Sequence, residues 1–301
     1  MNKLNFRSPA LRLPRARSRA RLLGLGLASL VSLLGARQAQ AATATVCASG
    51  CDYTSIQTAV TAAAPGDTLE LENGETFVES VTVDKDLRIR GRWNAPVVLD
   101  GDGADATLTV LTGATVTVDH VAITGADGTA GVVVNTGAVL KLRHSVVTSN
   151  VATYGGVLNM GTLMLRWNTL VSLNHSTSDF AGGINNFAGT VRVTPTPNDS
   201  GLFATIQGNT GYDGGGLANH SGTVELERVE FSHNSAYLGG GFHNGFGQAT
   251  LDDCLFLNND ATSIGGGWSN HNLGGTVTLG APTYAGNSTG TGAYTDFYDV
   301  N

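Results

Sequence analysis

Two carboxylates in the second half of the chain have the residue type and spacing to do chemistry. Glu227 and Asp252 occupy the same position in two similar segments, TVELERVEF and ATLDDCLF. If these segments stack as neighbouring parallel strands, the carboxylates lie about 4.8 Å apart. Such a pair raises the pKa of one partner, as the acid of a glycoside hydrolase requires. The equivalent position further up holds Arg143, so an ordinary charged strand surface explains the pattern, and we assign no catalytic residue.

The other acidic and histidine residues form no complete metal motif. Asp100, Asp102 and Asp105 in LDGDGAD have a calcium-like spacing, but the later bidentate glutamate of a helix–loop–helix site is missing. We interpret this segment as a Gly/Asp turn. His220 and His271 each follow an asparagine, but two repeats apart, and we interpret them as surface residues. The sequence therefore predicts no metal site and no cofactor, with loosely held Ca²⁺ as the alternative.

The cysteines indicate one disulfide. Cys47 and Cys51 in VCASGC are close enough to close a small loop in an oxidising compartment. Zinc is the competing interpretation, but two thiols without a neighbouring histidine pair are too few ligands. Cys254 takes the strand position that Val229 has one repeat earlier, which predicts a buried thiol.

The first 41 residues are typical of a secretory signal peptide. Seven basic residues among the first 21 precede an apolar run over 22–36, and the run is followed by the small-residue site Ala39-Gln40-Ala41. A membrane-spanning helix needs roughly 20 apolar residues, and this run is shorter. We therefore expect export by the general secretory route, a location outside the cell or at the outer-membrane surface, and no membrane span after processing.

Removal of this segment makes the protein strongly acidic. Residues 1–41 hold eight basic residues and no acidic one, so the formal charge changes from −7 to −15. Nucleic-acid binding depends on Lys and Arg that neutralise phosphates. We therefore expect no nucleic-acid partner.

The elements that position all these residues form an internal repeat. One signature, an apolar residue, two variable positions and asparagine, ends at Asn150, Asn174, Asn209, Asn234, Asn259 and Asn287. A second signature, GG-x-x-N, ends at Asn159, Asn186, Asn219, Asn244 and Asn270. The second series recurs every 25 to 33 residues, which suits one coil of a three-sided β-solenoid.

Each coil contains a third strand, with period-two alternation. In TVELERVEF the apolar side chains alternate with glutamates, which predicts one face inside and one outside. Asparagines that recur at the same corner can stack and pair their amides along the coil axis. We therefore interpret the eleven asparagines as a structural ladder and leave the binding residues unassigned.

The segment before the repeats predicts a cap. Tyr53 to Ala64 reads as a short helix that Pro65-Gly66 stops, and strands are expected over 68–71, 80–83 and 87–90, with a last one over 294–301. A helix there covers the open end of the core. We divide the chain into a signal peptide (1–41), an N-terminal cap with the first coil (42–91) and the β-helix coils (92–301).

Two features carry a resemblance to known families. The stretch from YTSIQTAV to LRIRG resembles the opening of pectin-lyase-like right-handed parallel β-helix proteins, including pectin methylesterases. The paired signatures resemble the polymorphic outer-membrane-protein repeat of chlamydial surface proteins. The resemblance implies an all-β parallel solenoid at the cell envelope with a role in adhesion.

We therefore predict a non-catalytic secreted or surface β-helix whose side wall contacts a glycan or a protein, with Trp167 as an exposed contact and the oligomeric state open. The alternative is a carbohydrate-active enzyme of the same fold, a lyase, hydrolase or esterase. The catalytic aspartate strand of pectin methylesterases, G-x-x-D-F-[IV]-F-G, is absent. In the alternative, the insertion over 194–203 in the 33-residue coil forms one wall of the groove.

Overall fold

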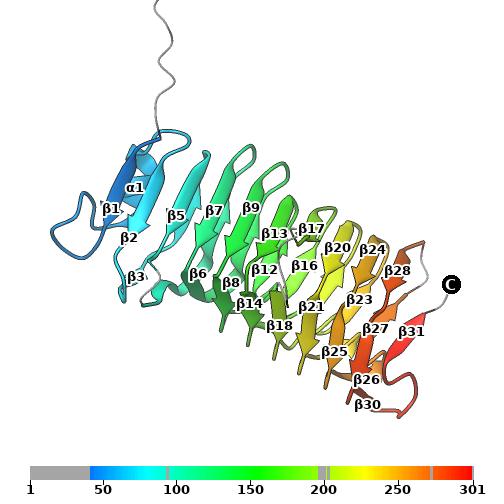
Figure 1. Cartoon of the computed structure of the whole chain (residues 1–301). Coiled ribbons are helices and arrows are strands. Elements are labelled where there is room, and N and C mark those ends of the chain that lie inside the picture. The colour runs from blue at the N-terminus through cyan, green and yellow to red at the C-terminus, as the bar shows by residue number, and fades with distance from the viewer. Residues whose placement is uncertain (1–40, 93–94, 196–200, 202–203, 272–273, 300–301) are drawn as a thin grey trace, which may run out of the picture. The chain divides into compact units, whose positions relative to one another are not determined.

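The chain folds as a right-handed parallel β-helix with three faces, which confirms the predicted fold class (Figure 1). The computed structural model describes residues 41–92, 95–195, 201, 204–271 and 274–299. The predicted signal peptide lies outside these residues except for Ala41. Within the described part of the chain, no helix has the length and apolar character needed to span a membrane.

The first face is a ten-stranded parallel sheet that runs the length of the solenoid. Its strands, one from each coil, are β1 (Thr43–Val46), β2 (Thr68–Leu71), β5 (Leu87–Arg90), β7 (Thr115–Asp119), β9 (Val139–Arg143), β13 (Thr162–Arg166), β17 (Thr190–Val193), β20 (Thr223–Glu227), β24 (Gln248–Asp252) and β28 (Thr276–Gly280).

The second and third faces belong to one larger sheet, because β6 (Val97–Val110) and β8 (Val121–Val134) cross the corner and contribute to both. The second face adds β3 (Thr76–Val78), β10 (Val146–Thr148), β14 (Thr169–Ser172), β18 (Ala204–Gln207), β21 (Val229–Ser232), β25 (Leu255–Leu257) and β29 (Thr283–Ala285). The third adds β4 (Val81–Val83), β12 (Val157–Asn159), β16 (Ile184–Asn186), β19 (Leu217–Asn219), β23 (Phe242–Asn244), β27 (Trp268–Asn270) and β31 (Phe297–Asp299).

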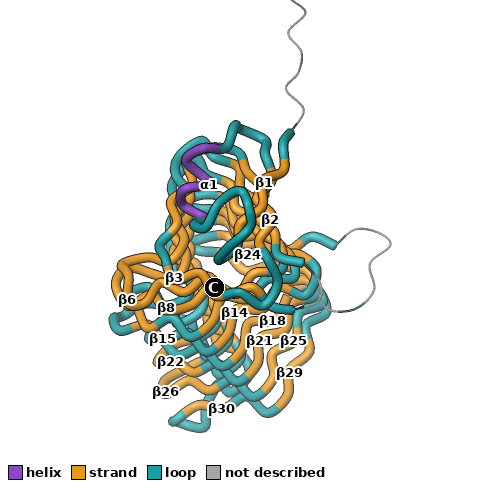
Figure 2. The backbone as a smooth tube through the Cα atoms, turned by 90° about the vertical axis from the view of Figure 1, so that its left-hand side faces the viewer, coloured by secondary structure: helices purple, strands orange, loops and turns teal. Residues whose placement is uncertain are grey.

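Short strands occupy the corner between the second and third faces: β11 (Val151–Ala152), β15 (His175–Ser176), β22 (Ser235–Leu238), β26 (Asp260–Ile264) and β30 (Ser288–Thr289). Figure 2 looks roughly along the coil axis and shows how successive coils lie over one another. Because every strand pairs in parallel with the next coil, each outward side chain has neighbours of known identity along the axis.

The core is filled by inward side chains that stack from coil to coil. Phe231 and Phe256 are fully buried and lie parallel, with ring centroids 5.0 Å apart, and Tyr284 continues the stack at 5.5 Å. Trp268 is also buried, and its indole N–H donates to the Tyr284 hydroxyl at 2.9 Å. These aromatic residues are therefore used for packing.

The repeated asparagines are buried at two corners and bond along the axis. In the first row each Nδ2 donates to the Oδ1 of the next asparagine, at 2.9 to 3.1 Å, in the order Asn150, Asn174, Asn209, Asn234, Asn259, Asn287. The second row, at 2.7 to 2.9 Å, is Asn159, Asn186, Asn219, Asn244, Asn270 and finally Asp299. Glycines flank these rows where the coils approach closely: a Cβ on Gly183 would lie 2.2 Å from the Gly216 carbonyl oxygen.

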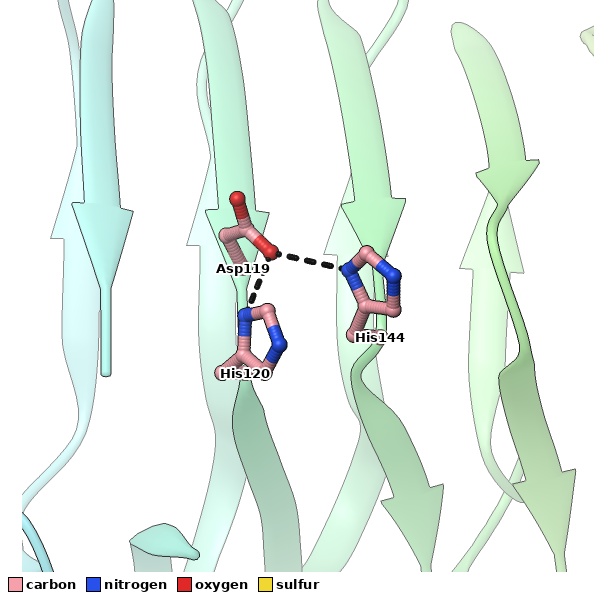
Figure 3. Close-up of side chains that lie close together, drawn as sticks. All are labelled: Asp119, His120 and His144. Atoms are coloured by element: carbon pink, nitrogen blue, oxygen red, sulfur yellow. Dashed lines mark hydrogen bonds and ion pairs between the residues drawn. The ribbon is translucent and has the colours of Figure 1, made fainter. Parts of the chain in front are cut away.

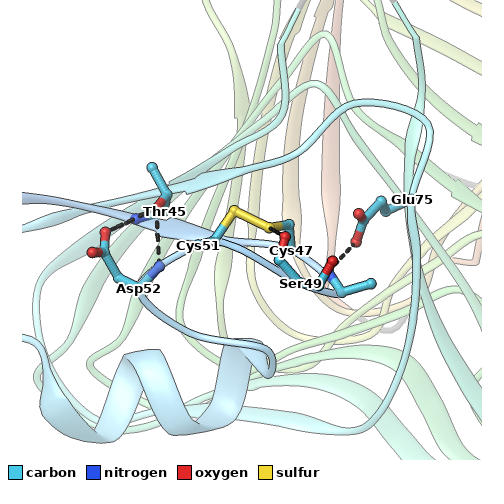
Figure 4. Close-up of a disulfide and its surroundings, with 7 residues drawn as sticks. Thr45, Cys47, Ser49, Cys51, Asp52 and Glu75 are labelled. Carbon is cyan, nitrogen blue, oxygen red and sulfur yellow. Dashed lines mark hydrogen bonds between the residues drawn. A yellow bond between two sulfur atoms is a disulfide. The ribbon is translucent and has the colours of Figure 1, made fainter.

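The N-terminal end is covered by helix α1 (Ile56–Ala62), which ends two residues before the predicted limit. Its first turn is capped by Ser55, and the Glu79 carboxylate accepts from the backbone N–H of Ile56 at 2.7 Å. Cys47 and Cys51 are joined by a disulfide in the loop after β1 (Figure 4). The strands β1 and β3 were not expected from the sequence.

The aspartates of LDGDGAD lie within strand β6, at the place where it crosses the corner between the second and third faces. Asp100 accepts from the Asp102 backbone N–H at 3.0 Å, and Asp105 accepts from the Thr129 hydroxyl at 2.8 Å. Asp102 and Gly103 have positive φ, and the pairing with β8 shifts register between Asp100 and Ala104, so the strand bends here as the predicted Gly/Asp corner requires.

Candidate functional site on the first face

Most positive charges of residues 42–301 gather on one side of the solenoid. Eight of the 17 Lys and Arg residues lie in 1–41, which leaves nine. Eight of the nine lie on first-face strands or within two residues of one: Arg88, Arg90, Arg92, Lys141, Arg143, Arg166, Arg192 and Arg228. The ninth, Lys85, follows β4, and its Nζ donates to carbonyls at the end of helix α1. In a protein of this acidity, such a concentration produces a local field opposite to the net charge.

The strand register shows how these charges are ordered. Along one outward row, Glu70, Arg90, Asp119, Arg143 and Arg166 are successive partners. Further down the face, Glu227 pairs with Asp252. The half of the face near the cap is therefore basic, and the half near β24 is acidic.

Several of these cations are paired with carboxylates. Arg90 contacts Glu70 at 2.7 Å and Arg192 contacts Glu225 at 2.9 Å. Exposed pairs of this kind contribute little to stability, but they reduce the charge that a ligand would meet.

Three cations on β9 and β13 have no such partner. Lys141, Arg143 and Arg166 make no ion pair with any residue that the structure describes. All three are half-buried. Burial is the main cause that lowers the pKa of Arg143; the charge of Asp119 opposes this effect, and the charges of Arg88 and Arg166 add to it. We call these three residues the cationic patch.

Beside the cationic patch, a buried carboxylate organises two histidines at the end of β7 (Figure 3). The Asp119 side chain is 7% exposed, and its Oδ2 accepts from Arg88 at 2.6 Å. Its Oδ1 lies 2.7 Å from His120 Nδ1 and 3.3 Å from His144 Nδ1. Burial alone would raise the pKa of Asp119, but the hydrogen bonds from Arg88 and His144 and the nearby charges lower it below the ordinary 3.8.

Aromatic stacking extends this cluster along the corner. His120 and His144 stack with ring centroids 4.5 Å apart, and Trp167 follows His144 at 5.7 Å. The Arg143 guanidinium lies 4.6 Å from the centre of the Trp167 ring. Trp167, predicted as an exposed contact, is half-buried between these neighbours, and Arg143 is thereby held in place on the face.

Asp119, His120 and His144 are, among the described residues, the one group whose potential ligand atoms converge, within 4.8 Å of one another. The residues present fit a charge-compensated cluster better than a metal site. Both Nδ1 atoms already lie against the same carboxylate oxygen, and Arg88 holds the other. A metal ion would have to displace these contacts beside a guanidinium. We therefore assign no metal-dependent chemistry to this cluster.

Asp119→Asn is expected to lower the free energy of unfolding by about 2–3 kcal/mol at pH 7, since an amide meets three donors with a single acceptor oxygen. The lowered pKa means that the stabilisation by Asp119 is present above pH 3.8 and is lost as pH falls through the folded-state value. Urea unfolding at pH 7 and pH 3 measures both effects. Asp252→Asn, at an exposed outward strand end, is the control; an equal loss in both variants would contradict the role of the cluster.

The carboxylates considered first as a catalytic pair do lie on adjacent strands. Glu227 and Asp252 are register partners and border a shallow hollow with Thr194. Glu227 also contacts Arg228 at 3.6 Å. Nothing in this arrangement distinguishes a catalytic acid from a catalytic base. Most of the insertion over 194–203, predicted as a groove wall in the enzyme alternative, lies outside the described residues.

Of the two histidines interpreted as surface residues, His271 is exposed and His220 is half-buried. Both line one cavity together with His243, which sequence reasoning passed over. The cluster at Asp119 was missed as well. Its signal was present, because VDH and LRH place Asp119-His120 and Arg143-His144 at the same position of successive repeats.

Comparison with known proteins does not identify the site. No family model and no curated protein matches the chain. An alginate lyase from Paenibacillus sp. str. FPU-7 is similar in structure, with 12% identity, 86% of this chain and 98% of that chain covered, and a TM-score of 0.44. The carrot pectin methylesterase has 11% identity, coverages of 86% and 88%, and the same TM-score. On such values neither a family nor an activity of those two proteins is assigned to this chain.

Proposed function

We propose that this β-helix is exported and binds an acidic polysaccharide along its first face. The observation that carries the proposal is the placement of eight of the nine Lys and Arg residues beyond residue 41 on this side. The predicted resemblance to surface proteins and the predicted leader are consistent with a ligand outside the cell. The sequence predicts that a side wall contacts a glycan or a protein. The proposal specifies this wall as the first face and its ligand as an acidic glycan.

The cationic patch suits a chain that carries one carboxylate or sulfate on each sugar. Successive coils bring outward side chains to a spacing of about 4.8 Å along the axis, so a polymer lying along the axis meets charges from neighbouring coils. Arg143 and Arg166 are direct register partners, and guanidinium groups bind carboxylates with two parallel hydrogen bonds. Lys141 adds a third charge on the same strand as Arg143.

A panel of polysaccharides tests the proposal. Residues 42–301 are titrated with polygalacturonate, alginate, a neutral glucan and double-stranded DNA at low and at physiological salt. We expect binding to the uronate polymers that weakens as salt rises, since exposed charges are screened. Equal or tighter binding to the neutral glucan, or binding to DNA alone, would contradict the proposal.

The same titrations test the enzyme alternative. Released unsaturated sugars would indicate a lyase, and released reducing ends a hydrolase. Either product would place catalysis on the bound acidic chain, whereas binding without products supports a contact surface.

A further inference from the structure

The outer surface of the third face is covered, unlike that of the first. Its outward side chains follow one another in register as Leu158, Asn185, Ala218, His243 and Ser269, and all are buried. The segments before each Gly-Gly pair fold over them. The third face therefore has a second layer, which gives it room for an enclosed site.

Near the middle of the solenoid this layer is aromatic. Tyr154, Phe180 and Phe187 pack together, and Phe187 stacks on the His220 ring at 4.2 Å. His220 Nε2 lies 3.2 Å from the Asn185 side-chain oxygen. This cluster fills part of the second layer, and its member His220 lines a cavity.

The cavity, of about 280 Å³, lies over β23. His243 lines it, is 4% exposed, and its Nδ1 contacts the Ser269 hydroxyl at 2.8 Å. Asp213 and His271 line it as well. Burial lowers the pKa of His243 to about 3 and that of His220 to about 4, so both rings are neutral at physiological pH.

Asp213 brings an unsatisfied group to this cavity. Its Oδ1 is buried and has no hydrogen-bond partner within the described ranges. Burial and the neighbouring Asp179 raise the pKa of Asp213 to about 6, and His271 opposes them. A buried carboxylate oxygen without a partner is costly. Because Asp213 also lines the cavity, its carboxylate is the acceptor that a hydroxyl-bearing ligand would meet there.

Aromatic surface lies at the rim. Tyr212 lines the cavity and stacks on Tyr237 with ring centroids 4.8 Å apart, and the two are 41% and 43% exposed. Phe246, on the other side, is 57% exposed. Exposed aromatic rings next to a polar cavity match a ligand that has both apolar ring faces and hydroxyl groups.

We propose that this cavity is a second ligand site and that it binds an uncharged sugar ring, with its hydroxyl groups donating to Asp213 and an apolar face on Tyr212. The charge of the region excludes an acidic ligand, because no Lys or Arg occurs from residue 229 to 301. The third face thus recognises a ligand that is chemically opposite to the acidic chain proposed for the first face. This inference does not depend on that function.

The test is saturation-transfer NMR and titration of residues 42–301 with glucose, galactose, mannose and xylose oligosaccharides, and with glucuronate and galacturonate. We expect at least one neutral sugar to bind. Asp213→Asn should weaken that binding about tenfold, by loss of an ionised acceptor, and Tyr212→Ala about fivefold. Tyr294→Ala is the control, since this tyrosine is also exposed and does not line the cavity.

Three results would overturn the inference: no neutral sugar binds, the uronates bind here more tightly than their neutral counterparts, or the Asp213 and Tyr212 variants bind as the Tyr294 control does. A variant with Lys141 and Arg166 changed to alanine separates the two proposals. It should lose uronate polymer binding and keep the neutral sugar. Circular dichroism of each variant checks that the fold is intact.

Discussion

Replacing Asn209 by alanine is expected to lower the free energy of unfolding by about 4 kcal/mol. This side chain is fully buried in the middle of the first asparagine row. Its Nδ2 donates to the Val171 carbonyl and to Asn234, and its Oδ1 accepts from the backbone N–H and the side chain of Asn174. The variant leaves several buried polar groups without partners, each at a cost of about 1–3 kcal/mol, partly relieved by relaxation.

Urea unfolding of residues 42–301, followed by far-ultraviolet circular dichroism, measures this change. Gln207→Ala is the matched control, because Gln207 is an exposed amide two residues earlier on the same coil; it should change the unfolding free energy by less than about 0.5 kcal/mol. A similarly small loss in Asn209→Ala would mean that water replaces the amide and that the row contributes little.

Changing Lys141, Arg143 and Arg166 together to alanine is expected to weaken polygalacturonate binding about 100-fold at low salt. Each exposed charge contact contributes up to about 1 kcal/mol, and three such contacts amount to roughly two factors of ten. Because these cations make no ion pair among the described residues, a ligand carboxylate does not have to displace a protein carboxylate to reach them. Isothermal titration at two salt concentrations gives both the affinity and its salt dependence.

The control is the double variant Arg192→Ala, Arg228→Ala. These two cations lie on the same face but contact Glu225 and Glu227, so their removal should weaken binding only a few-fold. An equal loss in both variants would show that total charge, and not the cationic patch, governs binding. Normal binding by the triple variant would show that the first face is not the binding site.

The local rules of this fold are readable in the sequence because each coil repeats them. Val224, Leu226 and Phe231 alternate with glutamates, and this alternation is sufficient to predict which side faces the core. Recurrence at fixed offsets also shows which positions share a corner. A helix at the N-terminal end follows from the apolar spacing and the stop at Pro65.

Other features depend on how the coils are ordered along the axis. Arg143 and Arg166 occupy equivalent positions of successive coils, but only the register of all the first-face strands shows that cations and carboxylates gather at different ends of this face.

What the sequence determined by itself is the repeating unit: three strands, two asparagine corners and an inside and an outside, because each is encoded by a period of two residues or one coil. Only the tertiary structure shows where the additional residues of the longer coils lie. The segments that carry Phe180 and Asp213 fold back over the third face, where Phe180 packs against His220 and Asp213 lines a cavity with His243 and His271. Their path follows from packing between neighbouring coils of different length, which the periodicity of the sequence does not predict.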